Sequence, residues 1–340
     1  FLDTEPTGLS TGAGSLAFLI GLGHFTDGGR CVELEQFYID DFAAEPLLVE
    51  AVDDRLRRAG AIVTYNGRTF DLPLMAARWV LARRPPRFPE LHLDLLAYTR
   101  RLWRMRLESC SLGSIESHVL RLRRMSDMPG SMIPGIWLEA QRGIQPERLV
   151  PVFDHHAQDI YSLAALTAVL ALAMREPDHA ILREAEVQWG LARLAESRGD
   201  LAAAAARLES AVLAARSGDL EFQLAMQLAR TYRRLGRMDE ALAIWRARVP
   251  HCRPDRLDPL IELAKYAEHV QKDLEAARRW TERALELLRA HDERAWYLGA
   301  GRLDAQTHQQ TVAALEHRLA RHCRKLAGRR APTDRSTPID

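Results

Sequence analysis

Residues 3–9 read DTEPTGL and place two acids at the end of a predicted strand. Residues two positions apart on a strand point to the same face, so Asp3 and Glu5 direct two carboxylates toward one point. Like charges at such close range repel each other unless a cation lies between them. Hard oxygen ligands of this kind suit Mg²⁺ or Mn²⁺. Taken alone, the stretch fits equally well with surface acids in a turn before Gly8.

Acids also lie at the ends of two later predicted strands. A short apolar run at 61–65 continues into YNGRTFDLP (65–73), which places Asp71 at the start of the next helix. In that position its carboxylate can cap free backbone N–H groups, so a helix-capping role and a metal-binding role both stay open. We expect Phe70 to pack inward and hold Asp71 at the sheet edge. Asp94, on an alternating strand pattern, is a minor candidate for a direct role.

The third acidic motif is HHAQD at residues 155–159. His155 and Asp159 are four positions apart, so they share one face of a helix. A histidine on a buried face is more often a packed or hydrogen-bonded core residue than a catalytic base. The carboxylate one turn away favours the functional role for His155. His156 lies about 100° round the helix and is the weaker candidate.

Strand and helix patterns alternate in the first half of the chain. The turn at 26–29 separates two runs that predict a hairpin. The alternation predicts a mixed central sheet flanked by helices. The expected elements are strands ending at Asp3 and at 15–25, 31–39, 61–65 and 91–96, and helices at 46–58, 72–82, 112–120 and 151–174, the last with an apolar stripe of Ile160, Leu163, Leu166 and Leu170.

From residue 180 to 325 the strand patterns end, and Ala, Leu, Arg and Glu dominate. Ala204, Ala241 and Ala276 recur at about the 34-residue period of tetratricopeptide repeats. An ordinary helical bundle rich in Ala and Leu stays open as the alternative. Residues 303–326 are expected to form a terminal capping helix. The expected domains are an α/β domain at 1–176, helical repeats at 180–326 and a disordered tail at 327–340.

Composition limits the classes of function. The chain has 340 residues, is 47% hydrophobic and has a formal net charge of +1, which argues against nucleic-acid binding by bulk positive charge alone. The four cysteines form no CxxC pair, which indicates free thiols and a cytoplasmic protein. We expect no membrane span, which needs ~18–20 apolar residues. The first residue is Phe1, so we expect the chain to begin inside a strand.

Together the three acidic motifs resemble those of DEDD exonucleases. DTEPTGL is similar to the first motif, YNGRTFDLP to the second as seen in proofreading domains of family B polymerases, and His155-x3-Asp159 to the third. With DMPGSMIP (127–134), the combination resembles the YprB-type branch of the ribonuclease H-like superfamily. There is one departure. The histidine subgroup has its histidine five positions before the last Asp, where this chain has Asp154, whereas His155 occupies the tyrosine subgroup's position.

The resemblance implies an α/β ribonuclease H-like domain with 3′–5′ exonuclease activity, acting on single-stranded ends of DNA or RNA. It implies two Mg²⁺ or Mn²⁺ ions. Asp3 would bridge both ions, Glu5 and Asp159 would complete one site, and Asp71 would help to hold the other. His155 would orient the attacking water and accept its proton, a task that suits an ordinary histidine pKa of about 6.5.

Nucleic acid must also be held, and arginines cluster at 100–106. These side chains could contact phosphates while nearby aromatic rings stack on a base, although a solvated helix face is the slightly favoured alternative. The residues are Arg100, Arg101, Arg104 and Arg106 with Tyr98 and Trp103, and a similar group is Arg83, Arg84 and Arg87.

The helical repeats suggest a protein partner. Two other functions therefore stay open. One is a catalytically weak nucleic-acid-binding module that acts as a scaffold through its repeats. The other is a pure scaffold, in which the acids serve as helix caps and surface charge.

Overall fold

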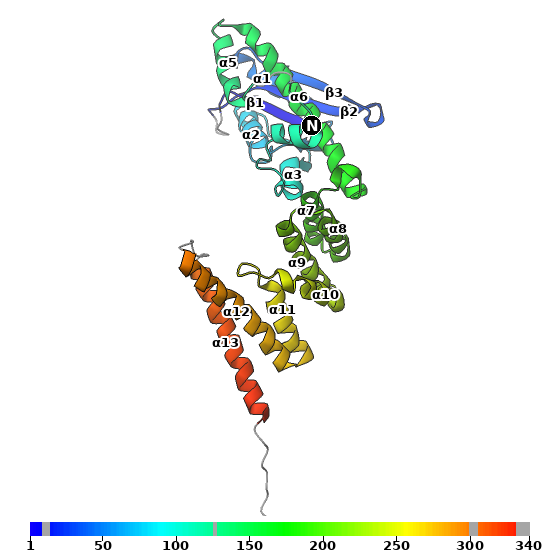
Figure 1. The fold of residues 1–340 in the computed structure, drawn as a ribbon. Coiled ribbons are helices and arrows are strands. Elements are labelled where there is room, and N and C mark those ends of the chain that lie inside the picture. The colour runs from blue at the N-terminus through cyan, green and yellow to red at the C-terminus, as the bar shows by residue number, and fades with distance from the viewer. Residues whose placement is uncertain (9–13, 125–127, 299–304, 331–340) are drawn as a thin grey trace, which may run out of the picture. The chain divides into compact units, whose positions relative to one another are not determined.

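The computed structural model describes residues 1–8, 14–124, 128–298 and 305–330 (Figure 1). It divides into two compact units, Phe1–Leu194 and Ala195–Asp340. The limits expected from sequence, 1–176 and 180–326, remain a prediction. Of the expected tail at 327–340, residues 327–330 continue the last helix, and the rest lies outside the described residues.

The first unit contains a mixed arrangement of strands, as predicted. Strands β1, β2 and β3 are antiparallel in that order, whereas β4 and β5 are parallel, and β4 lies beside β1. The register pairs Asp3 with Gly21 and Gly21 with Gln36. The strands are β1 (Leu2–Pro6), β2 (Ala17–Thr26), β3 (Cys31–Tyr38), β4 (Ala61–Thr64) and β5 (Leu91–Asp94).

Helices cover these strands, and the longest, α6, packs against β1, β2 and β3. Its predicted apolar stripe is buried, because Ile160, Leu163 and Leu166 have no exposed surface and Leu170 is 8% exposed. The helices of this unit are α1 (Glu45–Leu56), α2 (Asp71–Leu81), α3 (Leu95–Trp103), α4 (Leu112–Ile115), α5 (Ile133–Ala140), α6 (Leu149–Arg175) and most of α7 (Ala185–Ser197).

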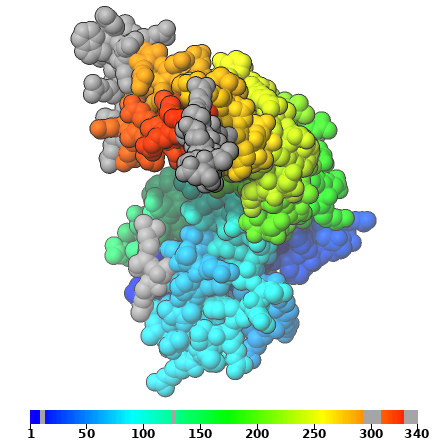
Figure 2. All heavy atoms as spheres, turned by 90° about the horizontal axis from the view of Figure 1, so that it is seen from below, coloured from blue at the N-terminus to red at the C-terminus, as the bar shows by residue number. Residues whose placement is uncertain are grey.

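The β2–β3 hairpin projects beyond the helices of this unit, and its tip is visible in Figures 1 and 2. At its base, the core is aromatic: Phe18 stacks on Trp137 with ring centroids 5.1 Å apart. Burial of such large rings stabilises this part of the core, because each ring removes a large apolar area from water.

The helix expected at 112–120 differs from the prediction. It is α-helical only over Leu112–Ile115 and continues as a π-helical turn over Glu116–Leu120. Such turns are frequent at functional sites. Here the turn begins at Glu116, whose side chain is buried next to the acidic motifs.

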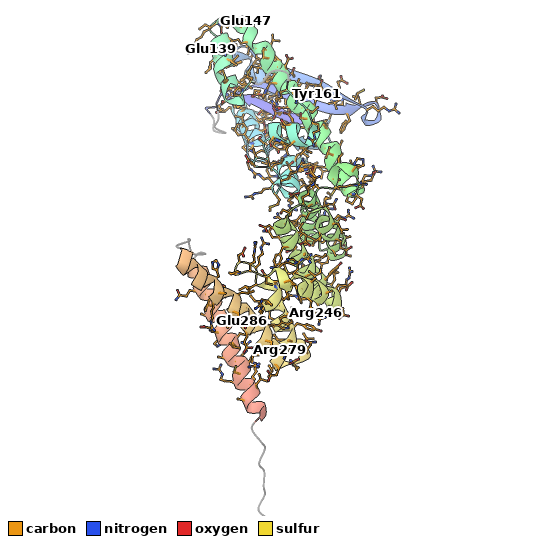
Figure 3. The ribbon with its side chains drawn as sticks, in the orientation of Figure 1. Glu139, Glu147, Tyr161, Arg246, Arg279 and Glu286 are labelled. Atoms are coloured by element: carbon orange, nitrogen blue, oxygen red, sulfur yellow. The ribbon has the colours of Figure 1, made fainter. Side chains whose placement is uncertain are left out.

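The helix α6 is also long and apolar enough, by length and composition alone, to cross a membrane, which was not expected. The stretch Pro146–Arg175 has a mean hydropathy of 1.5. The core helix of a globular domain gives the same signal, and α6 packs on the sheet. Its outer side is more exposed: Tyr161, labelled in Figure 3, is 44% exposed.

The first turns of α7 pack on the first unit, which explains why the division lies inside this helix. A Cβ at Gly190 would lie 2.6 Å from the Cα of Leu102, so only glycine permits this approach. Val187 and Leu191 share a core cluster with Leu102 and Trp103.

The second unit is helical throughout its described part, as predicted, and successive helices from α8 to α13 pack on one another. Ala204 and Ala241 are fully buried, but in the third predicted repeat the buried residue is Ala277 rather than Ala276. The tetratricopeptide assignment stays a prediction. The helices are α8 (Leu201–Ala214), α9 (Gly218–Arg234), α10 (Met238–Arg248), α11 (Asp258–Tyr266), α12 (Leu274–Leu298) and α13 (Ala305–Arg330).

Candidate active site

The structure brings together all five residues singled out from the sequence. Asp3 and Glu5 come from β1, Asp71 is the first residue of α2, and His155 and Asp159 lie one turn apart on α6. All five line one cavity of about 280 Å³. Residues distant along the chain therefore share one site.

Asp71 does not cap its helix. The N-cap position of α2 is Phe70, and no side chain caps this helix end. The Asp71 carboxylate instead accepts a hydrogen bond of 2.6 Å from the hydroxyl of Thr4. Phe70 is half-buried and lines the same cavity, consistent with the expected inward packing.

Asp94 has the structural role. It is the N-cap of α3, where its side chain accepts a hydrogen bond from the backbone N–H of Leu96. The same carboxylate accepts hydrogen bonds from the backbone N–H groups of Asn66 and Arg68 at 2.9 and 3.1 Å. Asp94 therefore holds the loop that leads into Asp71 and does not line the acidic cavity.

Three of the five residues have the spacing of a metal site. One ligand atom from each of Glu5, His155 and Asp159 lies within 4.8 Å of the other two. The His155 Nε2 atom is 3.5 Å from Asp159 Oδ2. This compact set combines two carboxylates with one imidazole.

His156 supports the site from behind. It is fully buried, and the Gln36 amide donates a hydrogen bond of 3.0 Å to its Nδ1. That bond assigns the proton to Nε2, which lies 3.2 Å from the backbone oxygen of Asp3 and 3.8 Å from its carboxylate. Burial lowers the pKa of His156 to about 4, so the ring is neutral. His156 positions Asp3 and does not face the cavity.

A glycine makes room for this histidine. A Cβ at Gly21 would lie 2.5 Å from Cε1 of His156 and 3.0 Å from a side-chain carbon of Ile160. Any larger residue at this point of β2 would force the His156 ring or α6 to move.

The carboxyl groups repel one another strongly. Burial, followed by the charges of Asp159, Asp71 and Glu5, raises the pKa of Asp3 well above its usual range. Burial and Asp159 raise the pKa of Glu5 to about 8. Burial also raises the pKa values of Asp71 and Asp159 to about 6. Unbalanced negative charge on oxygen donors fits hard divalent cations such as Mg²⁺ and Mn²⁺.

Arg124 enters the site and was not found from the sequence. Its guanidinium donates a hydrogen bond of 2.6 Å from Nε to Glu116, and it also bonds Asp159 and the ring of His155. Burial and this guanidinium lower the pKa of His155 below its ordinary value. Both effects favour the neutral form of the His155 ring. The adjacent Arg123 and Arg124 give no pattern that marks one of them as part of a site.

The arginine-rich segment at 100–106 is only partly available for nucleic acid. Trp103 is 1% exposed, so it cannot stack on a base, and Arg106 pairs with Glu184 at 2.5 Å. Arg100 and Tyr98 line a cavity of about 420 Å³ that also includes Arg68. In the second predicted group, Arg84 pairs with Glu50 and Asp53.

Comparison of the sequence with known protein families agrees with this geometry. The model of the RNase H superfamily matches residues 1–171. The chain belongs to the RNase H superfamily. Its members are generally nucleases and usually depend on divalent metals, which indicates nuclease-type activity for this member. No solved structure matches the chain.

One curated relative confirms the YprB-type resemblance. It is the uncharacterized protein YprB of Bacillus subtilis (strain 168), which is 31% identical over 291 residues. The matched region covers 84% of this chain and 68% of the relative. The similarity therefore extends beyond the RNase H superfamily domain into the helical region.

Proposed function

We propose that this chain is a divalent-metal-dependent 3′–5′ exonuclease that hydrolyses the ends of single-stranded nucleic acid by a two-metal mechanism. The observation that carries the proposal is the convergence of Asp3, Glu5, Asp71 and Asp159 on one cavity, with His155 beside them. The 3′–5′ polarity follows from the DEDD resemblance.

Each residue has a role in this scheme. Asp3 would hold both ions, with Glu5 and Asp159 on one and Asp71 on the other. Bound Mg²⁺ or Mn²⁺ supplies positive charge that lowers the pKa of the attacking water and stabilises charge on the phosphate. Thr4 and His156 fix Asp71 and Asp3 in place.

The chemistry is hydrolysis of one phosphodiester bond. The water oxygen bonds to phosphorus, and its proton passes to the neutral ring of His155. The bond between phosphorus and the 3′ oxygen breaks, and that oxygen takes a proton from solvent. The products are a nucleoside 5′-monophosphate and a strand shortened by one residue that ends in a 3′-hydroxyl.

A second function has one observation in its favour. The guanidinium of Arg124 bonds both His155 and Asp159, which engages two groups that catalysis needs. A catalytically weak nucleic-acid-binding module, recruiting a protein partner through its helical hairpins, would tolerate that arrangement. Such a module would bind an oligonucleotide and leave it intact.

A nuclease assay separates the two. DNA and RNA oligonucleotides labelled at the 3′ or the 5′ end are incubated with Mn²⁺, with or without EDTA. We expect Mn²⁺-dependent shortening from the 3′ end, lowered by at least about 10²-fold in Asp3→Asn and Asp159→Asn. Asp154→Asn, an exposed acid on the same helix, is the matched control and should keep full activity. Equal rates in Asp3→Asn and the unmodified chain would refute the proposal.

A further inference from the structure

A second cavity, of about 640 Å³, adjoins the acidic one. His155 and Asp159 line both cavities, so the two cavities share this part of their walls. The rest of the second wall includes Glu116, Arg123 and Arg124. Its volume lies within the ~300–1,000 Å³ of small-molecule sites.

The wall of this cavity contains the guanidinium of Arg124, which buried neighbouring side chains hold in place. The side chain of Arg124 is 17% exposed, and that of Glu116, which accepts its Nε–H, only 1%. The other Glu116 oxygen accepts a hydrogen bond of 2.6 Å from Ser162, whose hydroxyl in turn accepts one from Gln158. The guanidinium is therefore held by a network that α6 and the π-helical turn build together.

Burying these charged groups costs free energy, which indicates that the network serves a function. Burying a carboxylate requires hydrogen bonds and a counter-charge, and apolar residues of similar volume often stabilise a protein at least as well as a buried ion pair. The pair is not sealed off, because Arg124 still lines the cavity. A planar guanidinium that is fixed and reachable can bind two phosphate oxygens at once.

The position of the Arg124 guanidinium indicates which kind of ligand this cavity binds. Two of the three partners of Arg124, His155 and Asp159, belong to the acidic site. A phosphate bound at the acidic site is thus close to this guanidinium, while the 640 Å³ cavity offers room for the attached nucleoside. The exposed Arg123 adds positive charge on the same wall.

We propose, on the basis of the proposed function, that the cavity over Glu116 binds the terminal nucleotide, with Arg124 holding its phosphate. The ligand class is a nucleoside 5′-monophosphate, free or at the end of a strand. Arg124 moves from Asp159 to the phosphate when cations occupy the carboxylates, and Glu116 keeps hold of its Nε.

The test compares binding of 5′-AMP and adenosine to the full chain with Mg²⁺, by isothermal titration calorimetry. We expect 5′-AMP to bind at least about 10-fold more tightly than adenosine, since hydrogen bonds to a charged group are worth about 10- to 100-fold. In Arg124→Met this preference should fall by about 10-fold, because only the bound ions still attract the phosphate, whereas Mn²⁺ affinity should stay the same or rise because a competing cation is gone. The control Arg142→Met, at an exposed arginine outside both cavities, should behave as the unmodified chain.

The variant Arg124→Lys provides a second test in case Arg124→Met does not fold. Lysine keeps the positive charge but lacks the paired N–H donors of the guanidinium, so 5′-AMP affinity should fall about 3- to 10-fold. An unchanged preference for 5′-AMP in the folded variants, with Mn²⁺-dependent nuclease activity in the unmodified chain, overturns this inference alone. An unmodified chain that binds no Mn²⁺ overturns the proposed function as well.

Discussion

The hydroxyl of Thr4 donates a hydrogen bond of 2.6 Å to the carboxylate of Asp71. Both side chains are buried, at 5% and 4% exposure. This contact connects the first acidic motif, on β1, to the second, at the start of α2. One oxygen of the Asp71 carboxylate is thereby held in place by the protein.

Replacing Thr4 with valine should weaken the metal site without changing its shape. Loss of such an outer hydrogen bond typically costs about 10- to 100-fold in metal affinity or activity. We expect that loss in Mn²⁺ affinity by calorimetry and in nuclease rate. Thr167→Val, which removes a hydroxyl bonded to the backbone oxygen of Leu163 on α6, is the control and should leave both unchanged. Unaltered Mn²⁺ affinity in Thr4→Val would show that this bond does not support the site.

The raised carboxyl pKa values predict how stability depends on pH without metal. The pKa of Glu5 in the folded chain, about 8, lies above its ordinary value of 4.5. The stability that this group contributes is therefore complete below pH 4.5 and is lost as pH rises through 8. Metal-free protein in EDTA should unfold at progressively lower urea concentration between these pH values.

The variant Glu5→Gln isolates this effect. It removes the charge, so the metal-free chain should gain about 1–3 kcal/mol at pH 8, given about 1.4 kcal/mol for each unit of pKa shift. At pH 4.5 the gain should vanish. Glu50→Gln, an exposed acid on α1, serves as the control. A gain of the same size at both pH values would mean that repulsion among the carboxylates is not its source.

Gly21→Ala tests the contact between β2 and α6. The added Cβ would meet the His156 ring at 2.5 Å, so the helix or the ring must move. Overpacking of this kind costs about 1–3 kcal/mol, and a shift of the ring from Asp3 should lower the nuclease rate by about 10²-fold. Gly60→Ala, where no atom lies within 4 Å of the added carbon, should be near neutral. Urea unfolding and single-turnover rates measure the two effects, and a fully active Gly21→Ala protein would argue against the positioning role of His156.

The second unit has its own buried charge cluster at Glu268, which is 4% exposed. Burial raises the pKa of Glu268, but hydrogen bonds from Arg321, His322 and Lys325 outweigh it and hold the pKa well below the ordinary range. The stability gained is present above about pH 4.5 and is lost as pH falls below it. These bonds attach α13 to the π-helical turn at Ala267–Gln271.

Glu268→Gln should therefore release α13 at neutral pH. We expect a loss of about 2 kcal/mol, the size of a hydrogen bond to a charged group, and faster amide hydrogen exchange in α13. Glu275→Gln, at a half-buried position in α12, is the control. Slow exchange across α13 in Glu268→Gln would contradict this account of how the helix is held.

The proximity of the acidic residues was predictable because each motif is local. Alternation on a strand places Asp3 and Glu5 together, and helical spacing does the same for His155 and Asp159. The apolar stripe of α6 was equally predictable from the spacing of its apolar residues. These elements meet because the sheet and α6 each have one apolar face to bury.

The surroundings of the site were not predictable, since they depend on how elements meet in three dimensions. Nothing in the sequence marks Arg124 above Arg123, or shows that Glu116 reaches it through a π-helical turn. The role of His156 depends on the space that Gly21, on β2, leaves for its ring. In the helical region the tetratricopeptide period stays a prediction, and in the third predicted repeat the structure buries Ala277 instead of Ala276.

The central claim is that the four carboxylates form one divalent-metal site. The most direct measurement is a titration of Mn²⁺ into the metal-free chain at pH 8, followed by calorimetry or by the electron paramagnetic resonance signal of free Mn²⁺. We predict two bound ions per chain, and loss of at least one in both Asp3→Asn and Asp71→Asn, with Asp154→Asn unchanged. No saturable binding, or the same stoichiometry and affinity in all three variants, would contradict the claim.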